Sequence, residues 1–132
     1  MEAPLHTATA AALLLLLQLG LMMAVGFKRL ETGIGIGVGD NESLLLAVRR
    51  HGNLAENAAI FLVALACAEV LAGSNLMTLG IASAFVVVRI AHAVGLTIGS
   101  DANPARAIGA FGTLLSGLTI AAYLLYTIFN LS

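Results

Sequence analysis

Polar side chains that could bind a ligand recur at helical spacing within strongly apolar segments of this sequence. Arg49, Asn53 and Glu56 follow one another at i, i+4 and i+7, which places them on one face of a helix. In a later apolar segment, Arg89 and His92 are three residues apart and therefore also share a face. Because an ionisable group inside a membrane helix costs about 2.5–3.5 kcal/mol unless it is shielded, these side chains indicate a functional site.

The charges in this group do not balance, and the imbalance predicts the kind of ligand. Glu56 cannot alone neutralise the nearby arginines, which are Arg49, Arg50, Arg89 and Arg106. Arginine binds carboxylates through a planar fork of N–H donors. The surplus therefore predicts an anionic ligand with carboxylate groups, while Glu56 could receive a ligand ammonium. The alternative is a structural role, in which Glu56 and Arg89 form an interhelical ion pair.

Four apolar segments must position these residues. The 132 residues are 60% hydrophobic and 10% charged, with a mean hydropathy of +1.01, whereas soluble domains are about 25% charged. One helical crossing needs roughly 20 apolar residues, and lipid offers no partners to a non-helical backbone. We predict an all-α membrane protein, a four-transmembrane-helix bundle that forms one domain over residues 1–132. Its expected spans are Leu5–Phe27, Ser43–Leu71, Leu76–Ile98 and Ala105–Leu131.

The composition excludes several other classes of protein. Six Lys or Arg residues and a net charge of −1 leave no basic surface for a nucleic acid. The single cysteine, Cys67, permits no intramolecular disulfide and is expected to be a small packing residue. The sequence has no EF-hand, HExxH or His–Cys cluster, so no metal site is expected.

The basic residues predict the orientation of the chain, because Lys and Arg gather in cytoplasmic loops. Four spans place the loops 28–42 and 99–104 on the same side of the membrane. Most of the cations lie in or near these two loops: Lys28, Arg29, Arg49, Arg50 and Arg106. We therefore predict that both loops and the ligand site face the cytoplasm, and that both termini are periplasmic or lumenal. Because Lys28 and Arg29 follow the first span at once, we expect an uncleaved anchor.

A few further residues carry expectations about packing. Glu69 is expected to reach the headgroups near the outer end of the second span, and His6 is expected to be an exposed terminal residue. Small residues recur every fourth position in the third and fourth spans and allow close helix approach: Ala91, Gly95 and Gly99, then Gly112 and Ser116. The run TGIGIGVG at 32–39 lacks phosphate-loop spacing and is expected to be a flexible interfacial loop.

The segment RRHGNLAEN at 49–57, preceded by Gly39 and Asp40, resembles the second-helix signature of the MAPEG family. These are the membrane-associated proteins in eicosanoid and glutathione metabolism. The segment RIAH at 89–92 is similar to their third helix, and Arg106 matches the arginine that opens their fourth. The likeness covers the full chain, and small bacterial inner-membrane members look most similar.

The resemblance implies a left-handed bundle that assembles as a homotrimer among membrane lipids. It implies a glutathione site between adjacent subunits, near the cytoplasmic face, in which four residues would hold the tripeptide: Arg49, Asn53, Glu56 and His92. Arg89 would support Glu56 or the ligand. Arg106 would stabilise the thiolate, which would attack a lipophilic small-molecule substrate. Either Lys28 or Arg29 would correspond to a basic residue at the end of the first helix.

The sequence departs from the family pattern at positions that bear on catalysis. Leu96 stands where several family enzymes have a tyrosine, and Asn57 and Ala59 replace an aromatic residue and a proline. A glutathione transferase-like or peroxidase-like enzyme therefore stands beside a non-catalytic glutathione- or lipid-binding protein on the same fold. Two further alternatives are a small transporter coupled through Glu56, and a bundle whose polar stripe only fixes helix register.

Overall fold

The computed structural model describes residues 3–96 and 104–131, and these form four α-helices. The helices are α1 (Leu5–Thr32), α2 (Glu42–Ala72), α3 (Leu76–Gly95) and α4 (Pro104–Leu131). Each contains one of the expected apolar segments and is long and apolar enough to cross a membrane. The prediction of an all-α, four-helix membrane fold is therefore confirmed.

The helix ends differ in part from the expected span ends. The first helix continues beyond Phe27 to Thr32, so that Lys28 and Arg29 lie on its last turns. The third helix is described to Gly95, and its expected end at Ile98 lies outside the described residues. Asn41 begins α2 by accepting a hydrogen bond from the Leu44 backbone. A reciprocal pair of bonds between Asn75 and Thr78 begins α3.

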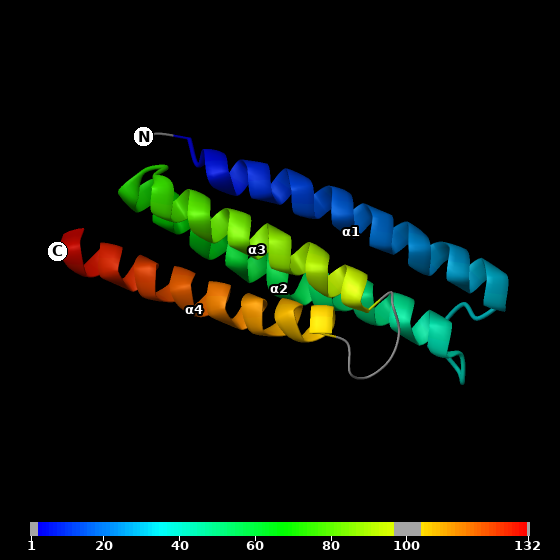
Figure 1. Cartoon of the computed structure of the whole chain (residues 1–132). Helices are drawn as coiled ribbons and strands as arrows, with labels where there is room; N and C mark the ends of the chain where they lie inside the picture. The colour runs from blue at the N-terminus through cyan, green and yellow to red at the C-terminus, as the bar shows by residue number, and fades with distance from the viewer. Residues whose placement is uncertain (1–2, 97–103, 132) are drawn as a thin grey trace.

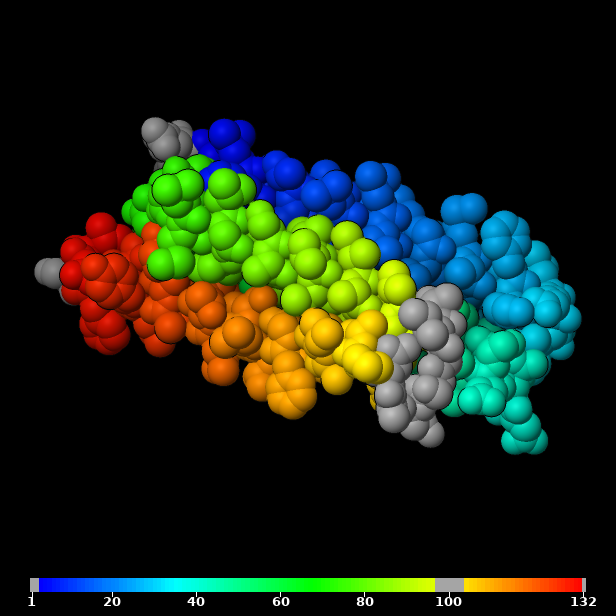
Figure 2. All heavy atoms as spheres, in the orientation of Figure 1, coloured from blue at the N-terminus to red at the C-terminus, as the bar shows by residue number. Residues whose placement is uncertain are grey.

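The four helices alternate in direction and bring both chain termini to one end of the bundle (Figure 1). The first helix packs on α2 and α3, and α4 packs on α3 and α2, whereas no contact joins α1 to α4 in the described part of the chain. Figure 2 shows α3 lying between α1 and α4 along this face of the molecule. The side chains of many large apolar residues point outward, among them Leu16, Ile60, Val87 and Leu115. An apolar surface of this extent fits contact with lipid.

The interior is filled by apolar side chains from all four helices. Phe61 of α2 and Phe85 of α3 stack with ring centroids 3.5 Å apart. Leu14 of α1 and Ile120 of α4 are buried in the same cluster. This core fixes the relative positions of the helices, so that polar residues at either end of the bundle are held in defined places.

Glycines allow α3 and α4 to approach each other closely at the end of the bundle opposite the termini. A Cβ atom on Gly95 would lie 2.5 Å from the Arg106 backbone nitrogen. A Cβ on Gly109 would clash with the backbone and Cβ of His92, and one on Gly112 would clash with Val88. The expected role of Gly95 and Gly112 is thus confirmed, and Gly109 is a third close-approach position that the spacing of four did not indicate.

The expectations for Glu69 and His6 are wrong. Glu69 is 2% exposed, and its carboxylate accepts hydrogen bonds from the backbone N–H groups of His6 and Thr7 at 3.1 and 2.7 Å. The first turn of α1 has neither an acidic residue nor a side-chain cap of its own. Since the first N–H groups of a helix need acceptors, Glu69 supplies them from α2 and is drawn into the protein. His6 is only partly exposed, with Nδ1 2.9 Å from the Thr78 hydroxyl.

Cys67 also differs from its expected role, because its side chain is exposed on the outer face of α2 and does not fill the core.

We predict that Gly109→Ala destabilises the bundle, because the new methyl group forces α4 away from His92. The expected loss is about 1–3 kcal/mol, which is typical of overpacking. Gly117 on the same helix is the matched control, since a Cβ there meets nothing within 4 Å. Thermal unfolding in detergent, followed by circular dichroism, should show a lower midpoint for Gly109→Ala only. Equal midpoints for the two variants would contradict the close contact.

Candidate functional site

A cavity of about 610 Å³ opens at the end of the bundle opposite the chain termini. Its lining residues come from the first half of α2, the end of α3 and the start of α4. Its polar lining consists of Arg49, Asn53, Glu56, His92 and Arg106. Leucines 45, 46 and 96 and Val48 supply an apolar part of the wall. The volume is within the range of about 300–1,000 Å³ that small-molecule sites occupy.

The second helix supplies three of the polar side chains. Arg49, Asn53 and Glu56 all line the cavity, as their spacing along one helical face requires. Arg49 and Glu56 are exposed in the single chain, and Asn53 is half-buried. Asn57, one residue beyond Glu56, turns its amide back to donate to the Asn53 carbonyl at 2.8 Å and does not line the cavity.

The other wall is made where α3 and α4 come closest. His92 and Leu96 of α3 face Arg106 of α4 across the same cavity. Gly95 and Gly109 bring them together, because neither has a Cβ to hold the two backbones apart. The three helices thus contribute the residues that the sequence indicated, and Leu96 occupies the wall beside His92 and Arg106.

Arg89 is not in the cavity but directly behind it. Its side chain is 1% exposed, and its guanidinium donates from Nη2 to the Asn53 Oδ1 at 2.7 Å and from Nη1 to the Thr113 hydroxyl at 3.0 Å. The predicted ion pair between Glu56 and Arg89 does not form. The ion pairs of the described residues involve neither side chain. Glu56 stays on the exposed side of α2, whereas Arg89 points into the interior of the bundle.

The hydrogen bonds of Arg89 decide which atoms of Asn53 are left for a ligand. A guanidinium has only donors, so it fixes the Asn53 amide with Oδ1 toward Arg89. The Nδ2 group of Asn53 is then directed to the other side as a donor. Thr113 completes the arrangement, since it accepts from Arg89 and donates to the Gly109 carbonyl at 2.7 Å. The sequence alone did not single out Thr113. Its place one helical turn after Gly109 on α4 is the feature that could have indicated it.

Two buried nitrogens near the cavity have no partner within the described part of the chain. They are Arg89 Nε and His92 Nδ1. Buried polar atoms of this kind are costly unless a ligand or an ordered water satisfies them. Of the two, Arg89 Nε is a donor, so it adds to the surplus of donors at this end of the bundle.

Lys28 and Arg29 do not line the cavity of the single chain. Lys28 pairs with Glu31 at 2.7 Å on the exposed side of α1. Arg29 donates from Nη1 to the carbonyls of Ile34 and Gly37, each at 3.0 Å. These two bonds hold the glycine-rich α1–α2 loop against the end of α1.

The lining gives the cavity the chemistry of an anion site with one acceptor for a cation. Arg49 and Arg106 face one carboxylate, Glu56, and the donors of Asn53 and His92 add to the positive potential. No group of three or more His, Cys, Asp or Glu side chains that could hold a metal ion is present in residues 3–96 and 104–131. The geometry thus suits a zwitterionic molecule with more carboxylates than ammonium groups.

Comparison with known proteins gives one match. The model of the MAPEG family matches residues 7–126, a range that includes all of the cavity lining. No curated protein and no solved structure matches the chain significantly.

Thr113→Val should destabilise the protein, because it leaves Arg89 Nη1 without its acceptor in a buried place. The expected loss is about 1–3 kcal/mol, the cost of a buried unsatisfied donor. Thr113→Ser keeps the hydroxyl and is the matched control. Unfolding midpoints in detergent should order as wild type, Thr113→Ser and then Thr113→Val. If Thr113→Ser is as unstable as Thr113→Val, the hydroxyl has no such role.

Proposed function

The chain belongs to the MAPEG family, and on that premise we propose that it is a membrane-bound glutathione-binding protein of the glutathione transferase or peroxidase type. The observation that carries the proposal is the convergence of Arg49, Asn53, His92 and Arg106 on one cavity to which the described residues contribute a single carboxylate, Glu56. Glutathione has two carboxylates and one ammonium group, so its charges complement those of the lining. Family membership supports a membrane protein related to glutathione in general, and the cavity supports the finer assignment.

The parts of the tripeptide fit different sides of the cavity. Arg49 and the Asn53 amide would bind carboxylates, and Glu56 would receive the ammonium, since all three side chains line the cavity. His92 offers a further donor from α3. Arg89 does not touch the ligand in this scheme, but it is a positioning residue because it holds the Asn53 amide in the donating orientation.

Arg106 is the residue that we assign to the thiol. A free thiol with a pKa of about 8.5 is mostly protonated at neutral pH, and an adjacent cation favours the nucleophilic thiolate. The thiolate sulfur would attack an electrophilic carbon, forming a C–S bond while the displaced electron pair leaves with the leaving group. The apolar wall beside Arg106, which includes Leu96, would receive a lipophilic substrate arriving from the bilayer.

We further propose a homotrimer. In the single chain, Arg49 and Glu56 are exposed at about 10 and 21 Å along α2 from its first residue. Exposing charges to lipid at such depths is costly, and a neighbouring subunit that covers this side of the cavity removes the cost. In this arrangement either Lys28 or Arg29 would approach the site of the adjacent subunit.

The membrane orientation follows from where the cations lie. The cavity end of the bundle contains Lys28, Arg29, Arg49, Arg50 and Arg106. The rule that cytoplasmic ends are positive supports a cytoplasmic cavity and periplasmic termini, in a bacterial inner membrane.

Arg49→Gln should weaken glutathione binding about 10- to 100-fold, because a charge-assisted hydrogen bond to a carboxylate is lost. Arg50→Gln is the matched control: it makes the same change of charge at the next residue, which does not line the cavity. Calorimetric titration of glutathione into the detergent-purified protein measures both. A loss of affinity that is equal in the two variants would indicate a general charge effect, and the absence of binding by the wild type would refute the proposal.

Arg106→Gln should raise the pH at which bound glutathione forms its thiolate, because the fixed positive charge is removed. Arg106→Lys retains a cation and should lie between this variant and the wild type. Ultraviolet absorbance of the thiolate, recorded against pH at saturating glutathione, gives the midpoint for each protein. Unchanged midpoints, together with unchanged conjugation of a generic electrophile, would exclude this role for Arg106.

A non-catalytic glutathione-binding protein is the second candidate, and Leu96 favours it. This leucine lies in the cavity wall beside His92, where it offers no hydrogen-bond donor to a thiolate. Saturable binding of glutathione without thiolate absorbance or conjugation would support this candidate over the enzyme.

A further inference from the structure

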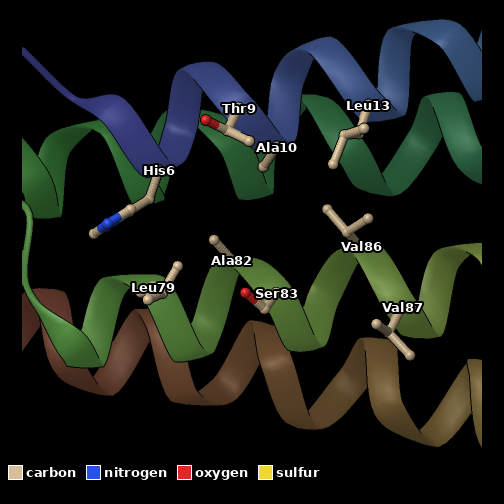
Figure 3. Close-up of a pocket in the computed structure, with 9 residues that line it drawn as sticks. All are labelled: His6, Thr9, Ala10, Leu13, Leu79, Ala82, Ser83, Val86 and Val87. Atoms are coloured by element: carbon tan, nitrogen blue, oxygen red, sulfur yellow. The ribbon is translucent and has the colours of Figure 1, made fainter.

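A second cavity, of about 290 Å³, lies between α1 and α3 in the half of the bundle that contains the chain termini. We call it the α1–α3 groove. Figure 3 shows His6 at one end of it, and Leu13, Val86 and Val87 at the other. It shares no lining residue with the cavity around Arg49 and Arg106, so it is a separate site.

The groove is mostly apolar along its length, where Ser83 adds one hydroxyl, and it is polar at the end that contains His6. Ala10, Leu13, Ala82 and Val86 line its length, and the Thr9 hydroxyl is already bonded to the Leu5 carbonyl at 2.9 Å. His6 stands in the first turn of α1, at the level where a span begins. From His6 to Leu13 the groove follows α1 for about 10 Å toward the middle of the helix. A molecule lying in it would therefore have its head at the membrane surface and its tail in the hydrocarbon.

The surroundings of His6 determine which of its ring nitrogens is a donor. Nδ1 lies 2.9 Å from the Thr78 hydroxyl oxygen and 3.1 Å from a Glu69 carboxylate oxygen. The Thr78 hydroxyl donates its only proton to the Asn75 carbonyl at 2.9 Å, so toward His6 it accepts. With two acceptors beside it, Nδ1 carries the proton. When the ring carries a single proton, its lone pair therefore lies on Nε2, which makes no hydrogen bond to any described residue and can accept one.

The charges near His6 exclude an anionic head group. All six Lys and Arg residues of the sequence lie in the half of the bundle away from His6. They are Lys28, Arg29, Arg49, Arg50, Arg89 and Arg106. The charged group next to His6 is the buried carboxylate of Glu69, which would repel a phosphate or an ionised carboxylate. The end of the groove thus fits a neutral head group with an O–H donor.

We propose that the α1–α3 groove binds one single-chain amphiphile with a neutral hydroxyl head, which donates its O–H to His6 Nε2 while its alkyl chain lies between Ala10 and Val86. The volume of the groove is too small for the two chains of a phospholipid and suits one chain. Glu69 and Thr78 are positioning residues for this site, since they hold the His6 ring with Nε2 free. The proposal does not depend on glutathione binding.

A photoactivatable long-chain alcohol tests the proposal with the full protein in phospholipid nanodiscs. Labelling should saturate, and peptide mass spectrometry should place the adducts on residues 5–13 and 79–87. Unlabelled alcohol should compete about tenfold better than its methyl ether, because the ether cannot donate a hydrogen bond. The corresponding fatty acid at a pH where it is ionised should also compete poorly. Labelling that does not saturate, or equal competition by alcohol and ether, would mean ordinary contact with bulk lipid and would overturn the proposal.

Substitutions test separately the part of the groove that binds the hydroxyl head and the part that binds the alkyl chain. His6→Phe removes the acceptor and should lower the affinity for the alcohol about tenfold. Ser83→Phe fills the groove from an exposed lining position and should abolish saturable labelling, whereas Ala12→Phe adds the same ring on exposed α1 surface outside the groove and should not. Normal labelling of Ser83→Phe would overturn the proposal.

A second copy of the chain could instead cover the groove. In a Cys67→Ser background, Ser83→Cys should react with a lipid-soluble thiol reagent in the absence of alcohol and be protected when alcohol is added. Protection without alcohol would show that a neighbouring subunit occupies the groove, and would also overturn the proposal.

Discussion

Arg89 is a buried cation whose two hydrogen bonds join the three helices that form the cavity around Arg49 and Arg106. It extends from α3, and its partners are Asn53 on α2 and Thr113 on α4. Inside a membrane no bulk water replaces a lost partner, so each of these bonds is held more firmly than its counterpart on a soluble surface. The bonds fix the spacing of the helices and the orientation of the Asn53 amide together. The donors offered to a ligand are thus set by a residue that is itself only 1% exposed.

Charged side chains lie inside both ends of the bundle, but their sign differs and so do their partners. In the lining of the cavity, as far as the chain is described, Arg49 and Arg106 face one carboxylate, Glu56, and their excess charge is available to an anionic ligand. At the terminal end, the Glu69 carboxylate is satisfied within the protein by His6, Thr7 and Ser74. The charged groups of the cavity therefore lack partners within the described protein, whereas the Glu69 carboxylate has all of its partners there. The difference explains why only the cavity end has the character of a polar binding site, and why the α1–α3 groove suits a neutral head group.

Periodicity was enough to predict the helices and the polar cavity lining that comes from α2 and α3. The spacing of Arg49, Asn53 and Glu56 defines a face of α2 whatever the neighbouring helices do, and the side chains of all three reach one cavity. Partnerships between helices could not be predicted in the same way, because rotation of each helix about its axis depends on packing. Glu56 and Arg89 have compatible depths, yet the packing turns Arg89 toward Asn53. For Glu69, the missing acceptors on the first turn of α1 decided its position, and that need is visible only once α1 is known to lie beside α2.

In the proposed mechanism, Leu96 leaves Arg106 as the residue that stabilises the thiolate. A hydroxyl at this place could donate a hydrogen bond to a thiolate, and Leu96 cannot. The same side chain is buried in the wall that it shares with Arg106 and His92. Beside an apolar side chain the attraction between a guanidinium and a thiolate is stronger than in water, since it is less screened. For the proposed glutathione site, an apolar residue here therefore removes one source of thiolate stabilisation and strengthens another, and the balance between the two separates an enzyme from a protein that only binds.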